Sequence, residues 1–170
     1  PLFVLNGSNL NLRRGDQTNA RGSKLVLNGS VTTVGTTASA IREEASTGIG
    51  TLEVQLSGTA DAVARTFNVA GGGANLTVAV PVTDGAATPG GITKAGGGTL
   101  TLSGGLANTY TGMTTVNAGG LTLNKTAGVN AIAGDVTVNA GTLTWAASNQ
   151  LADTSSLTIA GGVYNFANLD

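Results

Sequence analysis

The chain has 170 residues, with 27 glycines, no cysteine, 10% charged residues and 4% aromatic residues. A chain this apolar and this weakly charged is expected to fold, and the lack of cysteine excludes disulfides and thiolate chemistry. The net charge of −1 argues against a surface that neutralises nucleic-acid phosphates, so we expect no nucleic-acid partner. No apolar run approaches the roughly 20 residues of a membrane helix, so we expect no membrane insertion by this segment.

Short aliphatic segments recur in the first half of the chain. The sequence Val-Leu-Asn-Gly-Ser at Val4–Ser8 returns at Val26–Ser30. Val69 then leads through three glycines to a further aliphatic segment at Leu76–Val78. Between these segments, Ala38–Ala45 is the one stretch that favours a helix, with its adjacent glutamates on a solvated helical turn.

The same pattern is clearer in the second half. Val116–Leu123 returns with few changes as Val138–Trp145, and a weaker copy begins at Ile159. The spacing between equivalent aliphatic positions stays near a single value, roughly 22 residues, along the whole chain. These positions are Leu5, Leu27, Ile49, Val69, Ile92, Val116, Val138 and Ile159.

Each predicted strand is three to five residues long and alternates in character, as in Leu121-Thr122-Leu123. Such short strands are stable only when each one pairs with its copy in the next repeat. We therefore predict an all-β fold, a parallel β-helix (β-solenoid) of about eight rungs with roughly 22 residues each, as a single segment over residues 1–170. The ends carry no polar cap, which predicts that the segment is a fragment of a longer passenger or surface protein.

Three stretches, Gly91–Gly104, Asn108–Gly112 and Thr114–Leu123, stand in the order and wording of a known repeat. They resemble the autotransporter-associated β-strand repeat, with Met113 in place of a usual glycine and Leu106 as an extra residue. The resemblance implies a right-handed parallel β-helix in the passenger region of a bacterial surface or secreted protein. It implies an extracellular or cell-surface location, with anchoring in the outer membrane through regions outside this segment. It supplies no catalytic residue.

Catalytic and metal sites are not expected. A polysaccharide-active β-helix enzyme, the less favoured alternative, needs converging carboxylates or Ca²⁺-binding acids. The chain has no histidine, and several acids are isolated in sequence, namely Asp61, Asp84, Asp135, Asp153 and Asp170. We therefore predict no catalytic residue, no metal and no cofactor. The tripeptide Arg14-Gly15-Asp16 is interpreted as part of a solvated loop.

Two functions remain open, a structural scaffold and an adhesive module that binds glycan or a cell-surface protein. The polar loops at 124–135 and 146–156 are where we expect any binding function to be displayed. Trp145 has the inward phase of Leu123, and Tyr164, opposite in phase to Val163, is the candidate partner contact. The expected partners are the remainder of a longer polypeptide or end-to-end copies of the segment.

Overall fold

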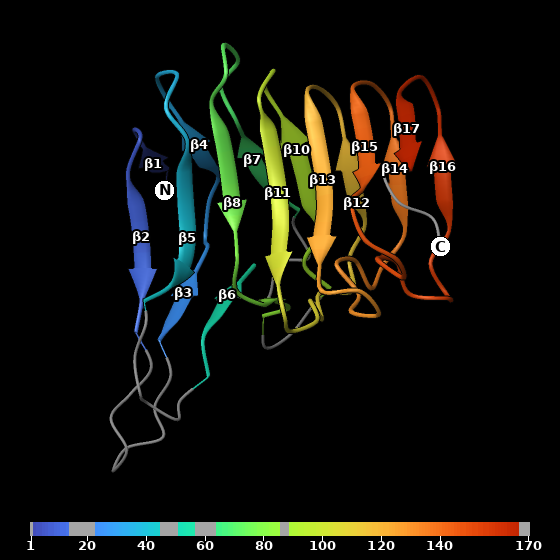
Figure 1. The fold of residues 1–170 in the computed structure, drawn as a ribbon, viewed down its shortest axis with the longest axis horizontal. Helices are drawn as coiled ribbons and strands as arrows, with labels where there is room; N and C mark the ends of the chain where they lie inside the picture. The colour runs from blue at the N-terminus through green and yellow to red at the C-terminus, as the bar shows by residue number, and fades with distance from the viewer. Residues whose placement is uncertain (1, 14–22, 45–50, 57–63, 86–88, 167–170) are drawn as a thin grey trace.

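The fold is a stack of short parallel strands. The computed structural model describes residues 2–13, 23–44, 51–56, 64–85 and 89–166. Within these ranges the chain forms strands, turns and bridges and no helix. Figure 1 shows successive strands side by side along the long axis, with the N- and C-termini toward opposite ends of the stack.

The described strands form three sheets, which we name A, B and C. Sheet A contains β1 (Phe3–Leu5), β4 (Val31–Thr33), β7 (Arg65–Asn68), β10 (Ile92–Ala95), β12 (Thr114–Val116), β14 (Val136–Val138) and β16 (Leu157–Ile159). Sheet B contains β2 (Asn9–Leu12), β5 (Ser39–Glu43), β8 (Asn75–Val78), β11 (Thr99–Gly104), β13 (Gly120–Lys125), β15 (Thr142–Trp145) and β17 (Val163–Phe166). Sheet C contains β3 (Lys24–Val26), β6 (Glu53–Gln55) and β9 (Val82–Thr83).

Neighbouring strands of a sheet come from successive turns of the chain, and the pairs are parallel, as β11 with β13 and β13 with β15. This confirms the predicted all-β solenoid. Sheets A and B each have seven described strands, which corresponds to about six full turns, and the expected count of about eight rungs is not confirmed. The right-handed winding implied by the family resemblance stays a prediction.

The repeat register is confirmed in the second half of the chain. Val116 pairs with Val138, and Val138 pairs with Ile159. Two expected equivalences are displaced, because Ile92 pairs with Thr114 and not Val116 on one side, and with Arg65 and not Val69 on the other. A shift by an even number of residues keeps the same face of a strand inward, so periodicity alone does not detect it.

The repeat register predicted for the first half is wrong. Leu5 pairs with Thr33 in sheet A, whereas Leu27 follows β3, a strand of sheet C. The first turn is longer than those of the second half, so the partner of Leu5 is Thr33, which comes just after the second copy of the repeated sequence. The two Val-Leu-Asn-Gly-Ser segments therefore lie at different corners of the solenoid. Ile49 lies outside the described residues.

The predicted helical turn at 38–45 is also replaced by a strand. Residues 39–43 form β5, in which Ser39 and Ile41 are buried. Ile41 is paired with Leu10 on one side and Val78 on the other, so the period of two from the core outweighs local helix propensity. Ala45 lies outside the described residues.

The core lies between the sheets and consists of aliphatic columns. Leu100, Leu121 and Leu143 pair in succession across sheet B, and all three are fully buried. A parallel column runs through Leu102 and Leu123. Because each turn adds one residue to each column, the core is continuous along the rod.

Candidate functional site

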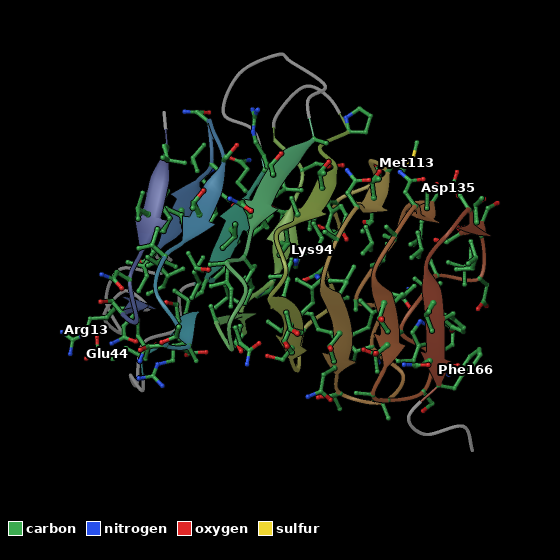
Figure 2. The ribbon with its side chains drawn as sticks, turned by 90° about the horizontal axis from the view of Figure 1, so that it is seen from above. Arg13, Glu44, Lys94, Met113, Asp135 and Phe166 are labelled. Atoms are coloured by element: carbon green, nitrogen blue, oxygen red, sulfur yellow. The ribbon has the colours of Figure 1, made fainter. Side chains whose placement is uncertain are left out.

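A buried lysine lies at the corner between sheets A and B. Lys94 points inward from β10, where its register partners are Phe67 and Val116, and it is 0% exposed. Its Nζ donates hydrogen bonds to the carbonyl oxygens of Ala95 at 2.7 Å, Gly96 at 2.8 Å and Ala118 at 3.0 Å. Figure 2 shows Lys94 in the interior of the rod.

The three acceptors of Lys94 belong to two successive turns, so the amine joins them. Burial lowers the pKa of Lys94 to about 8. An amine with this pKa could act as a nucleophile if a substrate reached it. Here it is enclosed and its three protons are engaged, so the amine holds the two turns together at this corner.

Glycines allow the turns to stack closely at the same corner. Gly96 has φ of +75°, and a Cβ atom there would lie 2.1 Å from the carbonyl oxygen of Val69. Gly119, one turn further, has φ of +65°, and its Cβ would lie 2.4 Å from the oxygen of Gly96. Glycine is therefore required at this corner, both for its backbone conformation and for the close approach of the turns.

Sheets A, B and C form three sides of the solenoid, and sheet C ends at β9. Beyond β9, buried side-chain amides hold this third side together. The Oδ1 of Asn108 accepts a hydrogen bond from the backbone N of Val82 at 2.9 Å, and its Nδ2 donates to the oxygen of Ala131 at 2.7 Å. Asn108 therefore joins the turn before it to the turn after it. Its buried position is not visible in the sequence, because it lies in an irregular segment with no alternation.

Gln150 has the same bracing role in the following loop. Its Oε1 accepts from the backbone N of Lys125 at 2.7 Å, and its Nε2 donates to the oxygen of Ser148 at 3.0 Å. The side chain is 0% exposed. The loop at 146–156, expected to be a solvated display loop, therefore has a buried polar anchor in its middle.

Asp84 and Asp135 accept hydrogen bonds that fix loops between the strands. Asp84 accepts from the backbone N of Gly90 at 2.7 Å through Oδ1, and from the hydroxyl of Thr111 at 2.6 Å through Oδ2. Asp135, labelled beside Met113 in Figure 2, accepts from the backbone N of Ser156 at 2.8 Å. Asp153 is exposed in the loop at 146–156, and the other two isolated acids, Asp61 and Asp170, lie outside the described residues.

The described acidic side chains form no metal-binding cluster. Nowhere in the described ranges do three or more acidic, histidine or cysteine side chains gather as they would around a metal ion.

The phenol of Tyr110 is hydrogen-bonded to the hydroxyl of Thr114 at 2.8 Å, and burial raises its pKa above the usual range. Tyr110 is therefore a neutral core residue.

Lys125 is a second buried lysine, at the end of β13. It is 1% exposed, and no described residue accepts a hydrogen bond from its Nζ. Burial lowers its pKa to about 8. The alternation that places Leu121 and Leu123 inward also places Lys125 inward, so the signal for its burial is present in the sequence.

Three aromatic side chains meet at the last described turn. Trp145 contacts Tyr164 and Phe166 edge to face, with ring centroids 5.8 and 5.5 Å apart, and Tyr164 and Phe166 are 4.1 Å apart. Trp145 is paired with Leu123 and packs against the core, as predicted. Phe166 is half exposed, and Figure 2 shows it near the C-terminal end of the rod.

The phase predicted for Tyr164 is wrong. Tyr164 is the register partner of the buried Leu143, so it points inward, and Val163 points outward. Burial raises the pKa of Tyr164 to about 12. The side chain stays partly accessible because β17 is the last described strand of sheet B. Its role as a partner contact remains a prediction.

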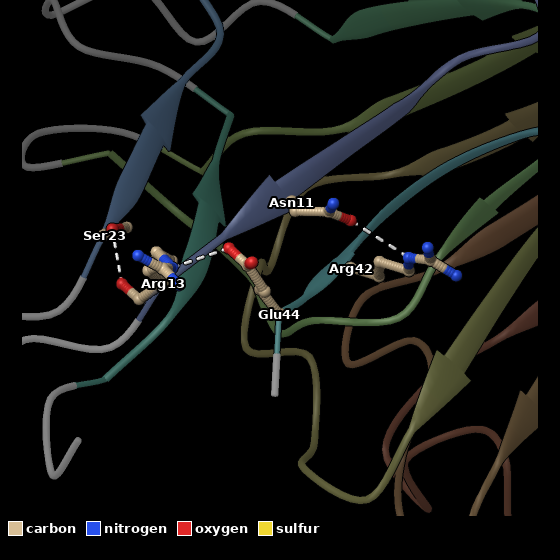
Figure 3. Close-up of polar contacts among 5 residues, drawn as sticks. All are labelled: Asn11, Arg13, Ser23, Arg42 and Glu44. Carbon is tan, nitrogen blue, oxygen red and sulfur yellow. Dashed lines mark hydrogen bonds and ion pairs between the residues drawn. The ribbon is translucent and has the colours of Figure 1, made fainter. Parts of the chain in front are cut away.

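Charged side chains join the first two turns (Figure 3). Arg13 and Glu44 form an ion pair with Nε and Oε2 2.7 Å apart, and the Nε of Arg42 donates to Asn11 at 3.0 Å. Both contacts cross between adjacent turns, because β2 pairs with β5. The hydroxyl of Ser23 donates to the carbonyl oxygen of Arg13 at 2.5 Å. Arg14-Gly15-Asp16 lies outside the described residues.

The fold and the buried polar contacts define a structural β-solenoid. Residues 92–123 and 118–144 match the family model described as the passenger-associated-transport-repeat. The chain thus carries this passenger repeat over residues 92–144, in agreement with the resemblance to the autotransporter repeat. No curated protein and no solved structure matches the chain. The described residues include no helix of the length and hydropathy that crossing a membrane requires.

Proposed function

We propose that residues 1–170 are one scaffold segment of the passenger region of a longer bacterial protein, located outside the cell or on its surface. The observation that carries the proposal is the passenger repeat at 92–144, where strands of successive turns pair in register and the inward side chains form a continuous core. A structural module is consistent with both the repeat and the fold.

The mechanism of such a scaffold is stepwise folding. Each strand of sheets A and B pairs only with strands of the neighbouring turns. A new turn can therefore form as soon as its residues emerge, because it needs only the turn already in place. Absence of cysteine also means that no native disulfide has to open for an extended chain to pass a narrow pore.

A crosslink between adjacent turns tests this mechanism. Thr101 and Thr122 are register partners, so Thr101→Cys with Thr122→Cys should form a disulfide that keeps two turns joined. Thr101→Cys with Thr144→Cys is the matched control, because these residues lie two turns apart and cannot be bridged. With the chain fused as passenger to an autotransporter translocator, the first variant should stall under oxidising conditions and recover with reductant. Normal surface display of the crosslinked passenger would contradict stepwise passage.

Adhesion is the second candidate function, supported by the exposed tip of the loop at 146–156. Asn149, Asp153 and Thr154 are exposed there, and Asn149 has φ of +54°. Glycan-array and cell-binding assays on the isolated chain test this function, with Asp153→Ala and Thr154→Ala as variants that leave Gln150 in place. Binding that these variants abolish would exclude a pure scaffold.

Contacts with the remainder of a longer polypeptide, or with end-to-end copies, are proposed for the apolar side chains exposed on the last two strands. Ile159, Val163 and Phe166 are 44%, 55% and 48% exposed. Tyr164, beside them, is the proposed contact residue. Protection of these side chains from chemical labelling in a longer polypeptide, and its absence in the isolated chain, is the expected result.

A further inference from the structure

The outer face of sheet B from β8 to β15 presents threonines at a fixed spacing. Thr77, Thr101, Thr122 and Thr144 are consecutive register partners on four adjacent strands. Each lies between inward side chains of its own strand, as Thr101 lies between the buried Leu100 and Leu102. The hydroxyl and methyl groups therefore recur at the ladder spacing of about 4.8 Å. We call this surface the threonine face.

A second column makes the array two-dimensional. Asn75, Thr99, Gly120 and Thr142 lie two residues before the first column on the same strands, and they are also register partners. The columns are about 6.6 Å apart along the strand. Thr99 and Thr142 thus give their strands a Thr-x-Thr pattern, and Asn75 and Gly120 take the same place on the other two strands.

The threonine face has no charge and leaves its hydrogen-bonding groups for solvent. Its remaining outward positions, Ser103 and Asn124, are uncharged as well. No described residue gives or accepts a hydrogen bond at the side chains of Thr101, Thr122 or Thr144. A hydroxyl of this kind offers one donor and two acceptor positions, all of which water must fill.

Sheet A provides the contrast. Its outward column is also a run of consecutive register partners that are threonines, namely Thr66, Thr93, Thr115, Thr137 and Thr158, so the two sheets differ in what flanks this column. That column is flanked by the exposed Met113 and by Asp135, and Thr137 is already in contact with the sulfur of Met113 at 3.7 Å. Beyond the strands, Asn139 donates a hydrogen bond to Asn117 at 2.9 Å. The outer face of sheet A therefore has a charged and a large apolar side chain beside its threonines, and some of its polar groups already bond to one another.

We propose that the threonine face is an ice-binding surface. Waters that bridge hydroxyls at one constant spacing are held in straight rows, and the spacing is close to the oxygen repeat along rows in ice. The methyl groups between the hydroxyls limit the alternative positions that each water can take. The surface of ice is uncharged and so is the threonine face. An anionic or cationic partner would find no complementary charge on it. The lack of aromatic side chains on the face makes ice a better fit than stacked sugar rings.

The test uses the isolated chain and measures partition into slowly growing ice together with inhibition of ice recrystallisation. The wild-type chain should enter the ice and slow recrystallisation. Thr122→Lys, and independently Thr101→Lys, should lose both effects, because a long charged side chain prevents close approach. Thr115→Lys is the matched control on sheet A and should keep both effects. Circular dichroism and thermal unfolding verify that each variant is folded.

Three results would overturn the proposal. One is a wild-type chain that ice excludes as fully as it excludes Thr122→Lys. Another is an equal loss in Thr115→Lys, which would show that the effect does not belong to sheet B. The third is retention on a neutral polysaccharide, lost in Thr122→Lys, without any effect on ice.

Discussion

Asn108 donates through Nδ2 to the carbonyl oxygen of Ala131 at 2.7 Å and thereby joins two turns of the solenoid beyond the end of sheet C. Together with the bond from Val82 N, this contact gives a buried side-chain amide the role that β9 plays for the preceding turns. The third side of the rod is therefore held by a few specific side chains, whereas sheets A and B are held by continuous ladders.

Replacing this amide should destabilise the rod strongly. Asn108→Ala leaves the buried N of Val82 and the oxygen of Ala131 without partners, and the expected loss is about 2–5 kcal/mol. Asn124→Ala, on the exposed outer face, is the control and should change the free energy of unfolding by less than about 0.5 kcal/mol. Urea unfolding of both variants measures the difference. Equal losses in the two variants would refute the bracing role.

Substitutions at Gly96 and Gly128 distinguish the cost of a steric clash from the cost of backbone strain. Gly96 and Gly128 have similar φ values of +75° and +82°, but a Cβ at Gly128 meets nothing within 4 Å. Gly128→Ala should therefore cost only the strain of a left-handed backbone, about 1–2 kcal/mol. Gly96→Ala adds a clash with the backbone oxygen of Val69 and should cost clearly more, to be measured by thermal unfolding. Similar costs would mean that the turns do not stack as closely as described.

The two buried lysines predict a rise in stability with pH. Because burial lowers the folded-state pKa of Lys94 and Lys125 to about 8 from the usual 10.5, the unfolded chain binds more protons between these values. The free energy of unfolding should therefore increase as the pH rises through that window. Urea titrations from pH 7 to pH 10 would measure the slope, and a flat profile would contradict the burial of the amines.

Lys125→Met distinguishes the two lysines. It removes an amine that has no described partner, so it should raise stability at pH 7 and reduce the slope. Lys94→Met removes three hydrogen bonds to backbone oxygens and should lower stability. Loss of stability in Lys125→Met at pH 7 would indicate that its amine has a partner after all.

The ion pair between the first two turns should contribute little to the free energy of unfolding. Arg13 and Glu44 have side chains that are 70% and 40% exposed, so solvent screens their attraction. A double-mutant cycle with Arg13→Ala and Glu44→Ala should give a coupling energy below about 1 kcal/mol, and lower still in high salt. A larger, salt-independent coupling would mean that the pair is shielded from solvent.

The aliphatic alternation predicted the second half of the fold well, because identical turns place Leu100, Leu121 and Leu143 in one column. It failed where turns differ in length, as between Leu5 and Thr33, since a repeated sequence then falls at another corner. Alternation also could not reveal Asn108, which acts within an irregular segment. Tyr164 shows a third limit, because its phase had to be counted from the paired Leu143 on the preceding turn.

The register of the first turn tests the fold most directly, and the absence of native cysteines makes the test clean. Val4 and Thr32 are register partners with outward side chains, whereas Val4 and Val26 occupy the same place in the repeated sequence but lie in different sheets. Oxidation of Val4→Cys with Thr32→Cys should form an intramolecular disulfide, and Val4→Cys with Val26→Cys should not. A disulfide in the second variant and none in the first would contradict the described solenoid.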